Sequence, residues 1–259
     1  MKNLSLIILF VFSSVLAMSQ MYNKTDSQGR KIGKWQKKFK NGQIKYKGQF
    51  ENGYETGQFI YYYPSGKIQS KINFTEKGTL AAIKTFYENG VIKATGFYRN
   101  KKKHGTWKYY GSKDGNLVSE ENYSNGIKNG VWKMYYPNGQ LASEVLWDNG
   151  LRNGPWKEYY SNGKLKLSAT FVEGKMAGSY ITYYIDGKIS RKGQYVNGKM
   201  DGVWIGFDVN GIKNSFQKYK MGFMEIEKRY ENGKQVYLMD NVNNKYIDNR
   251  KENNGKKKQ

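Results

Sequence analysis

The chain contains no cysteine and only three prolines among its 259 residues. Without cysteine it can form neither disulfides nor thiolate metal sites, so packing alone must hold the fold together. Its single histidine, His104, has no second imidazole with which to share a metal. His104 stands between a lysine and a glycine, in what we expect to be a surface loop between repeats. The sequence therefore predicts no metal site.

Recognisable catalytic motifs are also missing. The chain has no phosphate-binding loop, no G-x-S-x-G and no H-E-x-x-H. Its carboxylates are scattered over predicted turns, where they favour turn formation, and no pair recurs in an apolar setting that could separate two pKa values. Examples are Glu51, Asp148, Glu173 and Asp201. We therefore expect a protein that is not an enzyme and uses no cofactor.

A long apolar run occurs only at the N-terminus. Residues 4–17 are almost entirely apolar, Lys2 precedes them, and the small residues Ala17 and Ser19 come just before Gln20. This pattern is typical of a cleaved secretory signal, and the run is short for a membrane span. We predict a signal peptide over residues 1–19, a lead-in over 20–28, and an exported protein that is periplasmic, surface-bound or secreted. A retained anchor and a plain buried strand are the alternatives.

A repeat of 24 residues dominates the rest of the chain. The segment GVWKMYYPNGQ at 130–140 returns as GPWKEYYSNGK at 154–164, which points to an architecture assembled from copies. Eight units are visible, and the third has Ala81 where the others have the glycine of a G-x-W motif. These glycines are Gly33, Gly57, Gly105, Gly130, Gly154, Gly178 and Gly202. The large apolar residue two positions later is tryptophan in five units: Trp35, Trp107, Trp132, Trp156 and Trp204.

Each unit has the pattern of a β-hairpin. Ile44, Tyr46 and Phe50 alternate with lysine and glutamine, which indicates a half-buried strand. We assign a type I′ turn to the Asn-Gly pair before such strands, as at residues 41–42. We predict a short loop with glycine at both ends, such as residues 148–156, between successive hairpins.

A single hairpin is marginally stable in water, and stacked hairpins can bury the apolar surface that one hairpin leaves exposed. The predicted fold class is therefore all-β: an elongated, solenoid-like antiparallel sheet of about eight tandem 24-residue β-hairpin repeats. The array is predicted over residues 29–233, and a polar basic tail over 234–259. Two apolar columns predict the core. One contains Ile44, Ile68, Ile92, Leu117, Leu141, Leu165 and Ile189. The other contains Phe50, Phe74, Tyr98, Tyr123, Trp147, Phe171 and Tyr195.

The unit G-x-W-x-x-Y-Y-x-N-G-x-L resembles the MORN repeat, in the bacterial variant found in exported and antitoxin-labelled proteins. The resemblance covers residues 29 to about 233. It implies a chain of β-hairpins in a twisted, trough-like sheet, and a role in binding or scaffolding rather than catalysis. Because some bacterial members carry an antitoxin label, it also implies a candidate role in a toxin–antitoxin system. The Tyr-Tyr motif and the lysine-rich second strand depart from the eukaryotic pattern, so no eukaryotic membrane-junction function is carried over.

Aromatic and cationic residues define a predicted binding surface. Alternation places a row of aromatic residues, three positions after each tryptophan position, on the opposite face of the sheet. Such rings beside cations can stack on sugars or hold a peptide, whereas the alternative is that they pair across strands and only shield the sheet. The candidate partner-binding surface consists of Tyr62, Tyr110, Tyr135, Tyr159, Tyr183, Lys133 and Lys157.

The chain is strongly basic, with 44 Lys and Arg against 21 Asp and Glu and a formal net charge of +23. We expect lysines such as Lys45, Lys47, Lys164 and Lys166 on the face opposite the apolar columns. They either keep the sheet soluble and unpaired, or attract an anionic partner. We expect a protein-binding scaffold, antitoxin-like in one version, whose partner is another protein. The alternative is a binder of anionic lipid or glycan in the cell envelope, and export makes nucleic acid an unsuitable partner.

Overall fold

The computed structural model describes residues 22–249, in which the regular elements are antiparallel strands and one short 3₁₀ turn. The predicted all-β class with tandem hairpins is confirmed. The predicted signal peptide lies outside the described residues. The chain divides into two units, residues 1–127 and residues 128–259.

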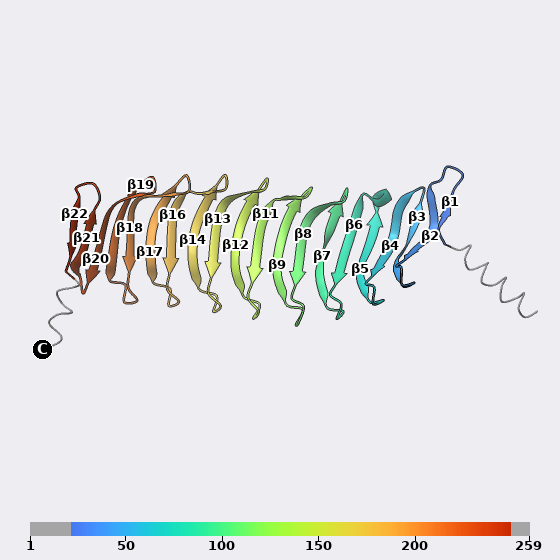
Figure 1. Ribbon diagram of the computed structural model, residues 1–259, viewed down its shortest axis with the longest axis horizontal. Helices are drawn as coiled ribbons and strands as arrows, with labels where there is room; N and C mark the ends of the chain where they lie inside the picture. Colours follow the sequence, from blue (N-terminus) through green and yellow to red (C-terminus); the bar gives the residue numbers. More distant parts are fainter. Residues whose placement is uncertain (1–21, 250–259) are drawn as a thin grey trace, which may run out of the picture. The chain divides into compact units, whose positions relative to one another are not determined.

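In the N-terminal unit, each strand pairs antiparallel with the next along the chain (Figure 1). The elements are β1 (Lys24–Thr25), β2 (Lys31–Lys38), β3 (Ile44–Glu51), β4 (Tyr54–Tyr62), β5 (Ile68–Thr75), η1 (Glu76–Gly78), β6 (Leu80–Phe86), β7 (Ile92–Arg99), β8 (Lys102–Tyr110) and β9 (Leu117–Ser124). The two-residue strand β10 (Ile127–Lys128) falls at the division between the units.

The C-terminal unit repeats the same antiparallel pairing, with the interrupted strands β15 and β16 both facing β14. Its strands are β11 (Gly130–Tyr135), β12 (Leu141–Asp148), β13 (Leu151–Tyr159), β14 (Leu165–Val172), β15 (Lys175–Met176), β16 (Gly178–Tyr183), β17 (Ile189–Val196), β18 (Lys199–Phe207), β19 (Lys213–Lys220), β20 (Phe223–Glu231), β21 (Lys234–Asp240) and β22 (Lys245–Asp248).

The strands continue beyond the predicted end of the array. We predicted a polar tail from residue 234, but β21 and β22 add two strands, and Val236 and Leu238 of β21 are each only 9% exposed. The predicted lead-in also contains the short strand β1. These strands were missed because they lack the G-x-W motif, although β21 follows the Asn-Gly pair at residues 232–233 and the buried Val236 and Leu238 are two positions apart, as in a half-buried strand.

The Asn-Gly turn after the Tyr-Tyr motif is not the type I′ turn that we predicted. At Asn41-Gly42 only the glycine has a positive φ, 83°. The N–H of Gly42 donates to the Phe39 carbonyl at 3.0 Å, and the Asn41 side chain accepts the N–H of Gln43 at 3.1 Å. This is a three-residue hairpin loop that ends in a left-handed glycine.

The type I′ turns lie at the other end of the strands. At Asn52-Gly53 both residues have a positive φ, 50° and 85°, and at Asn149-Gly150 the values are 46° and 87°. Both turns are two residues long, which suits the right-handed twist of the flanking strands. Because both ends carry Asn-Gly, the dipeptide alone could not distinguish them.

The motif glycine is a bulge inside a strand, whereas we predicted that it closes a loop. Strand β13 runs through Gly154, and its register with β12 shifts from Val145 opposite Trp156 to Trp147 opposite Arg152. Gly154 has a φ of 118°, and the other motif glycines also have positive φ. Bulges of this kind bend a strand and increase its twist, and glycine adopts their backbone conformation at little cost.

The third unit shows what happens without that glycine. Opposite Ala81 the β5–β6 ladder has no register shift, from the pair Ser70 and Thr85 to the turn. The turn itself is longer, since residues 76–79 include the η1 turn. The third unit therefore has two residues fewer in the strand, where the other units have a bulge, and two residues more in the turn. The 24-residue period is kept.

Aromatic rings interlock on one face of the sheet, which we call the core face. The ring of Trp107 meets Tyr98 at 4.9 Å and 72°, and Trp204 meets Tyr195 at 5.2 Å and 87°, which are edge-to-face contacts. Phe59 and Trp204 are 1% exposed and Trp107 is 3% exposed. The predicted column that contains Phe50 and Phe171 is thus confirmed as part of the core. The predicted column that runs from Ile44 to Ile189 is wrong as a core column: its members are only half-buried, and after a one-residue bulge Leu165 lies directly opposite Tyr159, on the other face of the sheet.

Glycines on neighbouring strands make room for the most buried rings. A Cβ atom at Gly96 would lie 2.3 Å from the Trp107 ring, and one at Gly193 would lie 2.1 Å from the Trp204 ring. No side chain fits under these rings, because real Cβ contacts are much longer. Glycine is therefore required at Gly96 and Gly193, because the indole rings of Trp107 and Trp204 pack directly on their backbone.

Tyrosine hydroxyls tie successive repeats together. The second tyrosine of the Tyr-Tyr motif donates a hydrogen bond to a backbone carbonyl 23 residues later, on the aromatic residue of the next repeat. The pairs are Tyr63 to Phe86 at 2.8 Å, Tyr87 to Tyr110 at 3.0 Å, Tyr136 to Tyr159 at 2.8 Å, Tyr160 to Tyr183 at 2.7 Å and Tyr184 to Phe207 at 2.8 Å.

Candidate binding surface

The face opposite the core carries the side chains that the sequence singled out, and we call it the open face. Strand alternation puts Lys84 there in the N-terminal unit and Lys157 in the C-terminal unit, because each follows a residue of the tryptophan column. All residues of the predicted surface are half-buried: Tyr62, Tyr110, Tyr135, Tyr159, Tyr183, Lys133 and Lys157. Their role in binding stays a prediction.

In the C-terminal unit a glutamate lies between the two predicted lysines and pairs with one of them. Glu144 lies directly opposite Lys133 on one side and Lys157 on the other. The Lys157 ammonium is 3.6 Å from a Glu144 carboxylate oxygen, and the Tyr159 hydroxyl donates to the same oxygen at 2.9 Å. Burial and this hydrogen bond raise the pKa of Tyr159. Tyr159 and Lys157 therefore share a face, as the sequence predicted.

In the N-terminal unit the equivalent row is cationic. Lys71 of β5 lies directly opposite Lys84 of β6, and Thr95 of β7 separates Lys84 from Lys108 of β8. Lys108 pairs with Glu120 at 2.8 Å, and that hydrogen bond raises the pKa of Lys108. Over residues 22–249, neither Lys71 nor Lys84 forms an ion pair. Like charges directly opposite each other destabilise a sheet.

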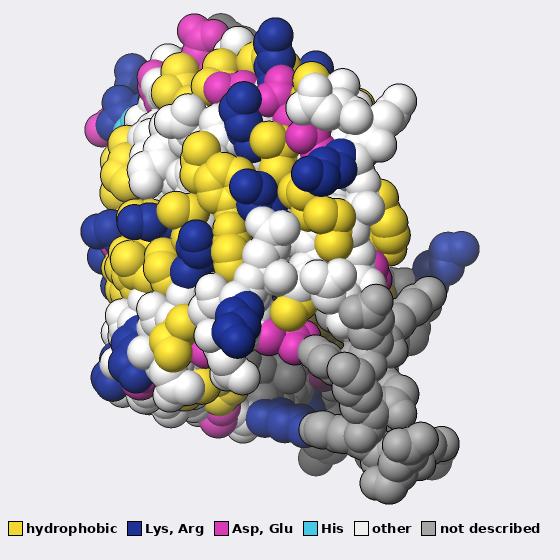
Figure 2. All heavy atoms as spheres, turned by 90° about the vertical axis from the view of Figure 1, so that its left-hand side faces the viewer, with side chains coloured by type: hydrophobic (Ala, Val, Ile, Leu, Met, Phe, Trp, Pro, Cys, Tyr) yellow, Lys and Arg dark blue, Asp and Glu magenta, His cyan; other side chains and the backbone are white. Residues whose placement is uncertain are grey.

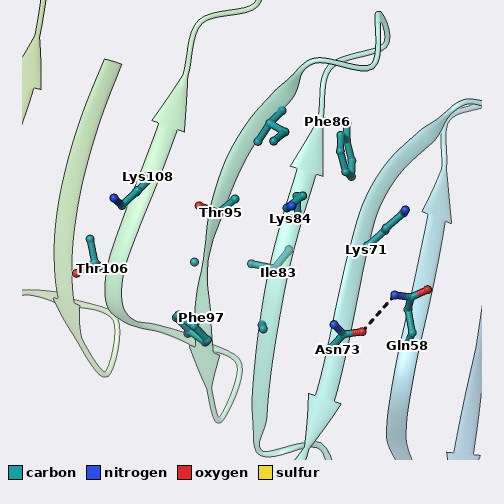
Figure 3. Close-up of a pocket in the computed structure, with 13 residues that line it drawn as sticks. Gln58, Lys71, Asn73, Ile83, Lys84, Phe86, Thr95, Phe97, Thr106 and Lys108 are labelled. Carbon is teal, nitrogen blue, oxygen red and sulfur yellow. Dashed lines mark hydrogen bonds between the residues drawn. The ribbon is translucent and has the colours of Figure 1, made fainter. Parts of the chain in front are cut away.

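These lysines line a hollow of about 740 Å³ on the open face of β4 to β8 (Figure 3). Figure 3 shows Lys71, Lys84, Thr95 and Lys108 on successive strands, and it shows Phe97 nearer the C-terminal end of β7 than Thr95. The Gln58 side-chain amide donates to Asn73 at 3.4 Å within the hollow. The lining thus combines cations, neutral hydrogen-bonding groups and aromatic rings, including Phe86.

Not all second-strand lysines lie where alternation put them. Lys166 occupies the bulge next to the hairpin loop, between the pairs Glu158 with Leu167 and Tyr159 with Leu165. Its ammonium is 3.2 Å from Glu158, which faces the buried Leu167, so Lys166 reaches toward the core face. A one-residue bulge breaks the alternation on which the prediction depended.

Other cations cover the rings of the core face, which accounts for part of the excess positive charge. The Lys128 ammonium lies 4.2 Å from the Trp132 ring centroid and 4.1 Å from that of Trp147. In the N-terminal unit, Lys103 contacts the Trp107 ring in the same way at 4.8 Å. Such cation–π contacts stabilise the core and use the charge internally.

His104 is not in a surface loop. It lies within β8, directly opposite Phe97, it is half-buried, and its Nδ1 atom is buried. The prediction failed because the predicted loop is a bulged strand. Among residues 22–249, no group of three histidine, aspartate or glutamate side chains is placed to hold a metal ion.

The sequence reasoning missed Lys71, Lys84 and Glu144. No motif marks them, because their significance lies in which residue faces them on the next strand. Cross-strand register could have identified them, had the bulges been recognised: Thr95 and Glu144 occupy the same repeat position, each between two lysines.

Tandem antiparallel hairpins with one aromatic core face and one open face define a β-hairpin repeat protein. Five segments match the MORN repeat variant, at residues 31–52, 55–76, 82–100, 128–149 and 152–173. The chain is therefore a MORN-repeat protein, and such repeats often take part in binding. No curated protein matches the chain.

Similarity to solved structures is slight. A crystal structure of TarM aligns with 13% identity and a TM-score of 0.27, over 37% of this chain and 20% of that one. A crystal structure of TcdB2-TccC3-TEV aligns with 10% identity and a TM-score of 0.22, over 84% of this chain and 15% of that one. The chain thus spans about a fifth or less of each of these two structures. Residues 22–249 contain no helix that is long and apolar enough to cross a membrane.

Proposed function

We propose that this MORN-repeat protein is a non-enzymatic scaffold that binds an acidic polypeptide on the open face of its C-terminal unit. The observation that carries the proposal is the row of half-buried tyrosines there, Tyr135, Tyr159 and Tyr183, beside lysines. Tyrosine supplies a large contact area at a low cost in conformational entropy, and it is enriched among the residues that dominate binding energy at protein interfaces.

The backbone beneath these rings is held firmly. The carbonyls of Tyr159 and Tyr183 accept the hydroxyls of Tyr136 and Tyr160 from the preceding repeat. Aliphatic side chains remain exposed on the same face, with Val203 45% exposed. A preorganised surface of this kind loses little entropy on binding.

The charge of the chain favours an acidic partner. At the end of the C-terminal unit formed by β20 to β22, hydrophobic side chains lie between lysines and arginines (Figure 2). Phe223 and Tyr246, on these strands, are 60% and 64% exposed. Complementary charge accelerates encounter and excludes basic partners, while the apolar groups supply affinity that salt does not screen.

The proposal includes export. If the predicted signal over residues 1–19 is cleaved, the scaffold meets its partner in the periplasm, at the cell surface or outside the cell. An antitoxin-like role is the special case in which the bound polypeptide is toxic and its active surface is covered on binding.

The test is affinity capture from an envelope and periplasm extract by the purified mature protein, at physiological and then several-fold higher salt. Each retained polypeptide is then purified and its Kd measured against wild type and the double variant Tyr135→Ala/Tyr159→Ala. We expect one acidic polypeptide that survives high salt and loses about tenfold or more in affinity to the double variant.

Two controls separate this outcome from general charge or misfolding. Tyr135→Phe/Tyr159→Phe keeps the rings and should retain most of the affinity, and Lys71→Gln/Lys84→Gln changes charge only on the other unit and should have little effect. A partner that is lost at high salt, or that binds the Ala variant equally well, contradicts the proposal.

A further inference from the structure

We propose that the hollow on the open face of the N-terminal unit binds an acidic oligosaccharide, one that carries carboxylate, sulfate or phosphate groups. The site lies on β4 to β8 and goes beyond the proposed polypeptide interface, which is on the other unit. It rests on a different set of residues and can succeed or fail independently.

The charge arrangement is the first argument. Lys71 and Lys84 face each other across β5 and β6. Adjacent strands are about 4.8 Å apart, so the stems of the two lysines are held close together. Lys71 is half-buried, which limits the screening of its charge by water. An anionic group between the two ammonium groups would relieve this repulsion, because an opposite charge within hydrogen-bonding distance favours both cations.

The composition of the lining is the second argument, and it favours a sugar over a simple ion. Gln58, Asn73, Thr95 and Thr106 present amides and hydroxyls that can both donate and accept hydrogen bonds, as sugar hydroxyls require. The Phe97 ring is 48% exposed at the hollow and offers an apolar platform for the C–H face of a sugar ring.

The shape of the site is the third argument. The row from Lys71 to Lys108 crosses three strand spacings, on the order of 14 Å, which suits a ligand with several rings. Because Lys108 is paired with Glu120, the charged groups of the ligand would lie at the Lys71 and Lys84 end of the row. Acyl chains of a lipid would need a continuous apolar trough, whereas lysines, amides and hydroxyls are interspersed among the apolar residues of this lining. The lining therefore favours a saccharide over a membrane surface.

The C-terminal unit supplies an internal control. At the repeat position of Thr95 it has Glu144, which lies between Lys133 and Lys157 and forms an ion pair with Lys157. The same hairpins with the same backbone thus lack a free pair of cations there. Binding of the acidic sugar should be confined to the N-terminal unit.

The test is isothermal titration calorimetry at physiological ionic strength, with the full mature chain and four probes. The probes are sulfated maltohexaose, unmodified maltohexaose, inorganic sulfate, and vesicles that contain phosphatidylglycerol. We expect saturable binding of sulfated maltohexaose, with the affinity falling about tenfold or more in Lys71→Gln/Lys84→Gln. Phe97→Ala should weaken binding of the sulfated sugar severalfold.

The matched control is Lys133→Gln/Lys157→Gln, which removes the same charge from the C-terminal unit and should change the affinity by less than about twofold. Circular dichroism and thermal unfolding of each variant establish that it is folded. Tyr135→Ala/Tyr159→Ala should leave sugar binding intact, which separates this proposal from that of the polypeptide interface.

Several results would overturn the inference. Equal affinity for inorganic sulfate would reduce the hollow to a simple anion site. Tighter binding to vesicles, lost in Lys71→Gln/Lys84→Gln, would make a lipid headgroup the ligand. Equal losses in both lysine variants would mean that the net charge, and not this hollow, attracts the sugar. No binding of sulfated maltohexaose would also contradict the proposal.

Discussion

The open faces of the two units differ in the residue that separates two lysines on neighbouring strands. Between Lys133 and Lys157 the C-terminal unit has Glu144, and between Lys84 and Lys108 the N-terminal unit has Thr95. The core faces of both units are built in the same way, from interlocked aromatic rings. A hairpin repeat can therefore keep its core constant while single open-face residues change the local charge.

The shared part of the comparison is the core, and its loss should have the largest effect. Trp107→Ala in the N-terminal unit and Trp204→Ala in the C-terminal unit should each lower the free energy of unfolding by about 3–5 kcal/mol, because both indoles are fully packed. Hydrogen exchange that resolves each unit measures this separately. A loss below about 1 kcal/mol in either unit would contradict a common core.

The bulge separates the third unit from the others. Gly105→Ala should cost about 1–2 kcal/mol, because Gly105 has a φ of 66° and a Cβ is unfavourable there. Ala81→Gly should cost only the greater backbone entropy of glycine, about 0.5–1 kcal/mol. Chemical denaturation compares the two variants. If Gly105→Ala were neutral, the positive φ would not be the reason for the glycine.

The charge difference between the open faces can be exchanged. Thr95→Glu should place a carboxylate between Lys84 and Lys108, weaken binding of sulfated maltohexaose about tenfold, and stabilise the N-terminal unit by about 0.2–1 kcal/mol. Glu144→Thr should have the opposite effects on the C-terminal unit. Calorimetry and thermal unfolding measure both. If Thr95→Glu bound sulfated maltohexaose with unchanged affinity, the row of Lys84, Thr95 and Lys108 would not take part in binding.

The smallest expected effect concerns pH and Tyr109 of the N-terminal unit. Burial, and then the Glu121 carboxylate, raise the pKa of Tyr109 from 10.0 to about 12. The folded state therefore keeps this proton at pH values where the unfolded chain has lost it, and the N-terminal unit should lose stability as pH rises from 10 to about 12. Tyrosinate absorbance follows the titration, and Tyr109→Phe should remove one late-titrating group. A Tyr109 that ionises near pH 10 would contradict the burial of its hydroxyl.

The sequence was sufficient to predict the repeats, the all-β class and the aromatic core. Those features depend on periodicity, which a 24-residue pattern records directly. It did not reveal that Gly154 forms a bulge or which Asn-Gly forms the type I′ turn, since the same residue types suit both turns. It also passed over Lys71, Lys84 and Glu144, because opposition across strands depends on a register that the bulges shift.

The predicted export, the polypeptide partner and the antitoxin-like role depend on other information. Residues 1–19 are outside the described structure, and a partner is defined by complementarity to a surface rather than by a motif. What the fold adds is the location of candidate surfaces, one on each unit, and the residues that distinguish them.

The most direct test of the central claim, that the two open faces bind differently, is hydrogen exchange of the mature protein with and without sulfated maltohexaose. The account predicts added protection in β5 to β8 and none in β11 to β18. Protection in β11 to β18, or spread equally over both units, would contradict it.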